Sequence, residues 1–164
     1  MSAPLHSGPL PLERRLTARQ SSTEAGFPSA GFGDLVHLAR LPQVTIPLVA
    51  VVDDDEPLCT ALADLIRSVG YRAEPFTSAE TLLISAIRFS LHCIVADVHM
   101  PGMGGFDLIR ELQGQGIATP VILITALSDA HLDEEAVSSG ALCLLRKPFE
   151  TRSLLDWIER SIVQ

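Results

Sequence analysis

The chain has 164 residues and a formal net charge of −8, with 47% hydrophobic and 20% charged residues. These values are typical of one soluble globular domain with a hydrophobic core of its own. Its three cysteines are odd in number and far apart, which excludes a disulfide framework and a zinc knuckle and favours the reducing cytoplasm. Residues 121–127, among the longest apolar runs, are too short to cross a bilayer, so neither membrane insertion nor secretion is expected.

Residues 1–46 differ from the rest of the chain in charge and composition. They carry four arginines and three acidic residues, and they include five prolines, four glycines and five serines without a sustained apolar period. We expect this segment to be a flexible N-terminal tail. Residues 47–164 form the predicted domain and carry eight cations against 17 anions. Such an acidic domain repels a phosphate backbone, so direct binding to nucleic acid is not expected.

From Pro47 onward, short apolar runs alternate with amphipathic stretches. The apolar runs predict five strands, at 48–52, 71–76, 93–96, 121–124 and 142–145. The helical periods predict five helices, at about 57–69, 78–87, 106–113, 129–139 and 150–162. Pro57 suits the first turn of the first helix, Gly70 its end and Ser78 the cap of the second. The predicted apolar stripe of the first helix consists of Leu58, Leu62, Leu65, Ile66 and Val69.

This alternation predicts a doubly wound α/β fold, in which a parallel sheet carries helices on both faces because parallel neighbours need crossover connections. In such a sheet, ligands bind beyond the carboxyl ends of the strands. The residues that follow strands one, three, four and five are Asp53–Asp55, Asp97, Thr125 and Arg146–Pro148. The candidate chemistry therefore falls on one edge of the sheet.

Carboxylates that follow neighbouring strands repel each other by about 4 kcal/mol per pair when their charges are roughly 4 Å apart and the effective dielectric constant is about 20. A hard divalent cation such as Mg²⁺ compensates this repulsion and leaves positions open for phosphate oxygens. The ammonium of Lys147, the only lysine in the chain, neutralises a further charge, and Thr125 offers a hydroxyl donor. An aspartate in such surroundings can attack phosphorus and hold an acyl phosphate.

Five segments resemble the response-regulator receiver domain of bacterial two-component signalling, particularly its FixJ-like subgroup. They are VAVVDDDEP, GYRAEPFTSAETLL, CIVADVHMPGMGGFDLI, TPVILITA and GALCLLRKPFE. The resemblance covers about residues 47–164. It implies the flavodoxin-like (CheY-like) fold, with a five-stranded parallel sheet of order 2-1-3-4-5 and five helices, which makes strands one and three neighbours.

The resemblance also implies a role for each residue at the predicted edge. Asp97 matches the phosphoacceptor, which receives a phosphoryl group from a sensor histidine kinase or a phosphotransfer protein. Thr125 matches the hydroxyl that turns toward this group, and Lys147 matches the lysine that binds it, with a cis bond to Pro148. The expected ligands of Mg²⁺ are Asp53, Asp54, Asp97 and the backbone carbonyl of His99.

Two positions depart from the family pattern. Leu144 stands where the family usually has a tyrosine or phenylalanine whose ring moves inward when the threonine turns, so we expect signal transmission to be altered. Leu127 occupies one of the positions that tune dephosphorylation in relatives. Because leucine cannot orient an attacking water, we expect slow autodephosphorylation.

The same residues have structural interpretations that need no ligand. Asp53–Asp55 can form a solvated helix cap, Asp97 can be a turn residue and Thr125 a strand end. The imidazole of His99 is expected neither to relay phosphate nor to bind metal. The cysteines are expected to fill the core; they are Cys59, Cys93 and Cys143.

We therefore predict a single-domain response regulator, a phosphoacceptor rather than an enzyme, that signals through protein contacts with a downstream target and forms a homodimer on phosphorylation. No output domain is expected, because the chain ends within two residues of the last predicted helix. The candidate contact face consists of Leu127, His131, Leu144, Trp157 and Arg160. The alternatives are an aspartate-nucleophile phosphohydrolase with Asp53 and Asp55 as a D-x-D motif, and a binding module that never carries phosphate.

Overall fold

The computed structural model describes residues 45–163, so the predicted tail lies almost entirely outside the described residues. The strands are β1 (Leu48–Val52), β2 (Arg72–Phe76), β3 (Cys93–Asp97), β4 (Val121–Thr125) and β5 (Cys143–Arg146). The helices are α2 (Glu56–Ser68), α3 (Ala79–Ile84), η1 (Ala86–Ser90, a 3-10 helix), α4 (Gly105–Gly114), α5 (His131–Ser139) and α6 (Thr151–Ile162). Strands and helices alternate in the predicted order.

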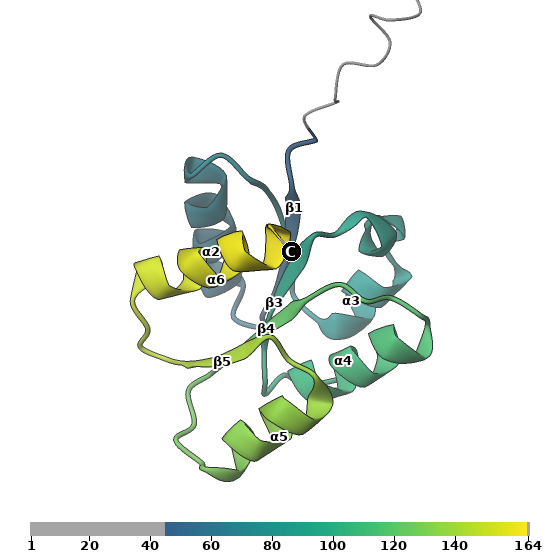
Figure 1. Cartoon of the computed structure of the whole chain (residues 1–164), viewed down its shortest axis with the longest axis vertical. Coiled ribbons are helices and arrows are strands. Elements are labelled where there is room, and N and C mark those ends of the chain that lie inside the picture. Colours follow the sequence, from purple (N-terminus) through teal and green to yellow (C-terminus); the bar gives the residue numbers. More distant parts are fainter. Residues whose placement is uncertain (1–44, 164) are drawn as a thin grey trace, which may run out of the picture. The chain divides into compact units, whose positions relative to one another are not determined.

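The strands form one parallel sheet in the order β2-β1-β3-β4-β5. This confirms the predicted doubly wound fold and its strand order. Figure 1 shows α2 and α6 on one side of the sheet and α3, α4 and α5 on the other, and the packing of their buried side chains agrees. In the register of the two central strands, Val52 of β1 pairs with Ala96 of β3, so Asp53 and Asp97 come next on adjacent strands.

The core consists of two layers, because successive side chains of each strand point to opposite faces. Ala50 and Val52 of β1 pack with α3, α4 and α5, whereas Val49 and Val51 pack with α2 and α6. All residues of β1, β3 and β4 are buried, which explains why these strands read as continuous apolar runs. Each fully buried aliphatic side chain contributes about 1.5–3 kcal/mol, and this packing fixes the strand ends that carry the candidate site.

Helix α2 begins and ends within one residue of its predicted bounds, and most of its predicted apolar stripe lies against the core. Pro57 lies in its first turn, and Gly70 follows its end with φ of +97°. The predicted stripe is partly wrong, since Val69 is 48% exposed. The buried residues of α2 are Cys59, Leu62, Ala63 and Ile66. The predicted residues Leu58 and Leu65 are partly buried against the same core layer.

The second predicted helix, 78–87, is divided in the structure. Ser78 caps α3 as predicted, accepting a hydrogen bond from the backbone N–H of Thr81 at 3.2 Å. The helix ends at Ile84, because Ser85 is extended (φ −74°, ψ 136°) and its hydroxyl accepts from Ile87 N at 3.4 Å to start η1. A serine that bonds its own backbone competes with helical hydrogen bonds, which explains the break.

Two composition-based predictions concern the cysteines and the membrane. Cys59 and Cys93 are buried and Cys143 is partly buried, all three as free thiols, which confirms their expected place in the core. Burial raises the pKa of the Cys93 thiol to about 11.

No helix within residues 45–163 combines the length and apolar character that crossing a membrane requires.

Candidate functional site

Three of the predicted site residues meet at the carboxyl edge of the sheet. Asp53 and Asp97 are only 2% and 7% exposed. The ammonium Nζ of Lys147, just after β5, lies 2.9 Å from Asp53 Oδ2 and 2.6 Å from Asp97 Oδ1. Strand β4 separates β5 from β3 in the sheet, and the long lysine side chain spans that gap. One cation therefore joins two buried anions from different strands.

The other oxygen of each aspartate is held by the backbone. Asp53 Oδ1 accepts a hydrogen bond from the N–H of Asp55 at 2.9 Å. Asp97 Oδ2 accepts one from the N–H of His99 at 2.7 Å. Each carboxylate is thus fixed between a backbone donor and Lys147, an arrangement that orients both groups.

The pKa of Lys147 is raised above its ordinary value. Partial burial of the ammonium is the largest single influence and lowers the pKa, but hydrogen bonds and charges from Asp97 and Asp53 together outweigh it. The lysine therefore stays protonated, and at neutral pH it neutralises one of the two buried charges. An excess of negative charge remains at this edge.

These residues line a pocket of about 400 Å³. Its walls come from the predicted acidic residues, the residues after β3 and β4, and the lysine: Asp53, Asp54, Asp55, Asp97, His99, Ala126, Leu127 and Lys147. Residues at or just after the ends of β1, β3, β4 and β5 therefore all contribute to this one hollow.

The acidic triplet divides into three different environments. Asp53 is buried in the site, and Asp54 is exposed at the rim of the pocket. Asp55 caps α2, with Oδ1 accepting from the N–H of Leu58 at 3.1 Å. The cap interpretation is therefore right for Asp55 and wrong for Asp53.

The side chains of the pocket include carboxylates, whose oxygens are suitable ligands for Mg²⁺. Among the described residues, no three His, Cys, Asp or Glu side chains are grouped closely enough to hold a metal ion. Two buried carboxylates nevertheless converge on one cation, Lys147, and Mg²⁺ is commonly held by only one or two carboxylates with waters in the remaining positions. The residues present fit such an ion through Asp53 and Asp97, while ligation by Asp54 and His99 stays a prediction.

Thr125 is placed at the end of β4 as predicted, but its hydroxyl is turned to the following loop. The residue is 1% exposed, and its Oγ1 accepts from the N–H of Leu127 at 3.1 Å. Its carbonyl accepts from the N–H of Lys147 at 2.7 Å. The predicted cis bond between Lys147 and Pro148 is confirmed.

Arg146 is a residue whose contacts the sequence did not predict. Its guanidinium donates to the carbonyls of Leu127 at 2.7 Å and Asp129 at 3.2 Å, and it forms an ion pair with Asp133 at 2.6 Å. Two of these three acceptors are backbone carbonyls, which leave no signature in the sequence. In the sequence, Arg146 stood out only because it directly precedes Lys147.

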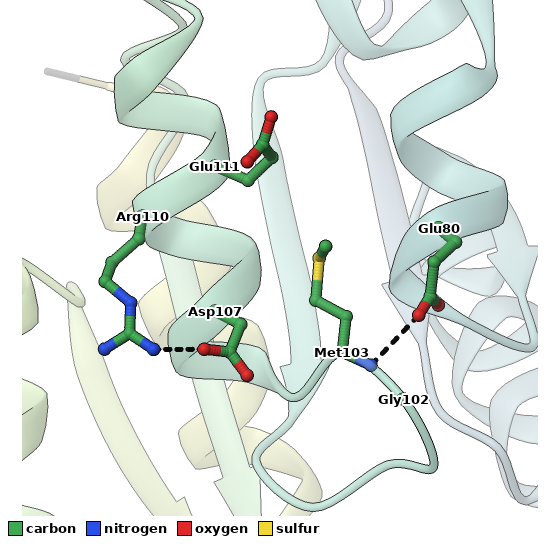
Figure 2. Close-up of a pocket in the computed structure, with 6 residues that line it drawn as sticks. All are labelled: Glu80, Gly102, Met103, Asp107, Arg110 and Glu111. Carbon is green, nitrogen blue, oxygen red and sulfur yellow. Dashed lines mark hydrogen bonds and ion pairs between the residues drawn. The ribbon is translucent and has the colours of Figure 1, made fainter.

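A second pocket, of about 510 Å³, lies between α3 and α4 and contains none of the predicted site residues (Figure 2). Glu80 Oε1 accepts from the N–H of Met103 at 3.0 Å, which ties α3 to the loop after β3. Hydrogen bonds from the backbone N–H groups of Glu80 and Met103 lower the pKa of Glu80. Gly102 has φ of +78°, and a Cβ there would lie 2.6 Å from Glu80 Oε1. Close packing of this loop against Glu80 therefore favours glycine at position 102.

Comparison with known protein families matches residues 49–159 to the response regulator receiver domain. The chain therefore belongs to the receiver domain family, whose members are phosphoacceptor signalling domains of two-component systems and typically use Mg²⁺. This assignment confirms the family resemblance drawn from the five sequence segments.

Individual relatives agree with the family assignment. The response regulator protein TodT of Pseudomonas putida is 34% identical over 115 residues, which are 70% of this chain and 51% of TodT. The transcriptional regulatory protein FixJ of Azorhizobium caulinodans is 36% identical over 114 residues, which are 70% of this chain and 54% of FixJ. Among solved structures, the crystal structure of FixJ-N resembles this chain with a TM-score of 0.66 and 33% sequence identity. The match covers 73% of this chain and 96% of the FixJ-N chain. The chain spans about half the length of the curated relatives it matches.

Proposed function

We propose that Asp97 accepts a phosphoryl group from a sensor histidine kinase or a phosphotransfer protein, and that the chain signals through protein contacts. The observation that carries this proposal is the bridge from Lys147 to Asp53 and Asp97, which gathers a nucleophile, a second anion and a cation in one pocket. Neither a solvated cap nor a turn residue needs such an arrangement.

In the proposed reaction, a carboxylate oxygen of Asp97 forms a bond to phosphorus while the bond from phosphorus to the donor nitrogen breaks. The product is an acyl phosphate on Asp97 and a free imidazole on the donor. Lys147 is already 2.6 Å from Asp97 and stabilises the negative charge that accumulates on the transferred group. Thr125 would then redirect its hydroxyl from the loop to a phosphoryl oxygen.

Asp53, Asp54, Asp97 and the carbonyl of His99 would hold Mg²⁺. When bound, the ion supplies positive charge to the oxygens of the transferring group. The chain's own contribution is the fixed orientation of Asp53 and Asp97, which the backbone N–H groups of Asp55 and His99 provide.

We further propose that the domain signals through protein contacts, as a phosphorelay intermediate or a regulator of another protein. Its contact face would include Leu127, which is 49% exposed, and Trp157, over whose ring the Arg160 guanidinium lies at 5.0 Å. Phosphorylation would change the partner preference of this face and allow a homodimer to form. Direct contact with nucleic acid is not part of the proposal, because of the acidic charge of the domain.

The phosphohydrolase alternative loses its support at Asp55. In a D-x-D motif both carboxylates must face the substrate, whereas the Asp55 carboxylate caps α2 by binding the N–H of Leu58. The inert binding module remains the alternative that an experiment must separate from the phosphoacceptor.

Incubation with radiolabelled acetyl phosphate and Mg²⁺ tests the proposal. We expect stable label on the wild type, none on Asp97→Asn, and full labelling of Asp156→Asn, which removes an exposed carboxylate of α6 that does not line the pocket. Absence of label on the wild type supports the inert module. Label that persists on Asp97→Asn and disappears with Asp53→Asn supports the phosphohydrolase.

A further inference from the structure

The segment that joins β4 to α5, residues 126–130, is held by one side chain from a neighbouring strand. Arg146 is the last residue of β5 and pairs in register with Thr125, the last residue of β4. Its guanidinium reaches past the end of β4 and donates to the carbonyls of Leu127 and Asp129. The same group forms the ion pair with Asp133 in the first turn of α5.

Leu127 is the residue at which these contacts meet the candidate site. Its N–H donates to Thr125 Oγ1 at 3.1 Å, and its carbonyl accepts from Arg146 at 2.7 Å. The position of the Thr125 hydroxyl and the position of the Arg146 guanidinium are therefore linked through a single residue. We therefore expect a change in the contact of the Thr125 hydroxyl to move Leu127 and, with it, the segment that the Arg146 guanidinium holds.

The ion pair extends this link to helix α5. The N-cap residue of α5 is Ala130, whose side chain cannot accept a capping hydrogen bond. The first turn of the helix carries two acidic residues, Asp133 and Glu134. Arg146 thus supplies, from β5, a cation at the beginning of a helix whose own first turn is acidic. The same side chain contacts the loop and the helix, so the two are held as one unit.

We propose that Arg146 is a positioning residue that holds residues 126–130 and the start of α5 in the resting arrangement, and that its release couples the state of Asp97 to α5. This inference rests on the proposed function, because it concerns how a phosphoryl group on Asp97 is communicated. The aromatic residue that the family uses for this purpose is replaced by Leu144, which is partly buried against the core. A charged contact, instead of a moving ring, carries the signal in this chain.

Beryllofluoride, a stable phosphoryl analogue, tests the proposal on the full chain with Mg²⁺. The variant Arg146→Met removes the contacts and keeps an unbranched apolar stem, and we expect it to bind beryllofluoride about fivefold tighter or more. Loss of a positive charge near the pocket would by itself weaken binding of an anion. Tighter binding therefore distinguishes release of the loop from a change in charge, and weaker binding overturns the proposal.

Two further variants keep the test independent of a folding defect. Asp133→Asn removes only the ion pair, and we expect a shift in the same direction but smaller, because the carbonyl contacts of Arg146 remain. Arg152→Met removes an exposed arginine of α6 and serves as the matched control, with unchanged affinity expected. An affinity of Arg146→Met equal to that of the wild type and of Arg152→Met overturns the proposal.

Backbone amide NMR provides a readout that a purely structural role would not produce. In analogue-free Arg146→Met, we expect the amide resonance of Leu127 to lie closer to its position in the beryllofluoride-bound wild type. If the wild type itself does not bind beryllofluoride, the proposed function fails and this inference fails with it. If the wild type binds but the variant shows neither the resonance shift nor tighter binding, only the role of Arg146 is refuted.

Discussion

Lys147 Nζ lies 2.6 Å from Asp97 Oδ1, although 50 residues separate the two along the chain. The same ammonium is shared with Asp53, so one cation serves two buried anions. Removal of either anion therefore leaves a balanced pair, whereas removal of the cation leaves two unbalanced carboxylates. This asymmetry determines how variants of the site are expected to behave.

Asp97→Asn is expected to stabilise the metal-free protein. The substitution removes the repulsion between the two carboxylates while the Lys147 to Asp53 pair remains, and we expect a gain of about 1 kcal/mol in the free energy of unfolding. Urea denaturation in the presence of a chelator measures it. Asp156→Asn, outside the pocket, is the control with little change, and a clear loss of stability in Asp97→Asn would contradict the expectation.

Added Mg²⁺ is expected to raise the melting temperature of the wild type. A ligand that binds only the folded state stabilises it by about 2.7 kcal/mol at a free concentration about 100 times its dissociation constant. Differential scanning calorimetry across a magnesium titration measures this, with matched additions of sodium chloride to control for ionic strength. Asp53→Asn should abolish most of the response. A melting temperature independent of Mg²⁺ would refute the metal site.

Glu80 is expected to contribute to the acid sensitivity of the fold. Its pKa is lowered in the folded state by backbone N–H donors, so its contribution is present above the unfolded pKa and is lost as the pH falls through the folded pKa. Glu80→Gln keeps an acceptor for Met103 N–H and removes the titration. Between about pH 5 and pH 3, stability of this variant should fall less steeply than that of the wild type.

Chemical denaturation at several pH values measures the slopes for Glu80→Gln. Glu134→Gln, an exposed glutamate of α5 outside both pockets, is the matched control. Parallel slopes for the wild type and Glu80→Gln would show that the bond to Met103 does not favour the ionised carboxyl group.

Leu127→Gln is expected to shorten the lifetime of the phosphorylated protein severalfold. Leu127 lines the pocket and is 49% exposed, so an amide there can orient a water toward the phosphoryl group as leucine cannot. Loss of label from purified protein after removal of acetyl phosphate measures the rate. Val137→Gln changes an exposed apolar residue of α5 outside the pocket and should leave the rate unchanged. An equal lifetime in Leu127→Gln would contradict the expectation.

The sequence predicted the sheet well because all residues of β1, β3 and β4 are buried, and burial on both faces leaves continuous apolar runs. It also predicted which residues meet, because the carboxyl ends of parallel strands share one edge. The separate environments of Asp53 and Asp54 were not predicted, although the alternation of side chains along a strand places adjacent residues on opposite sides. Apolar periodicity likewise could not show that α3 ends at Ile84, just before Ser85, whose hydroxyl accepts from the backbone N–H of Ile87.

The contacts of Arg146 and Glu80 illustrate a second limit of sequence reasoning. Both side chains bind backbone groups, the carbonyl of Leu127 and the N–H of Met103. Every residue offers a carbonyl, and every residue except proline offers an N–H. No pattern of side chains identifies these partners before the loops are placed in space. The residues that position the site were therefore found only from the structure.

The lone primary amine among the side chains of this protein lies inside its acidic pocket. Reagents that acylate lysine will consequently modify only one side chain, Lys147, in addition to the α-amino group. Because protonation suppresses the nucleophilicity of that nitrogen, its rate of acylation reads out how firmly the surrounding aspartates hold it. Occupancy of the pocket can thus be followed by mass spectrometry of the acylated protein.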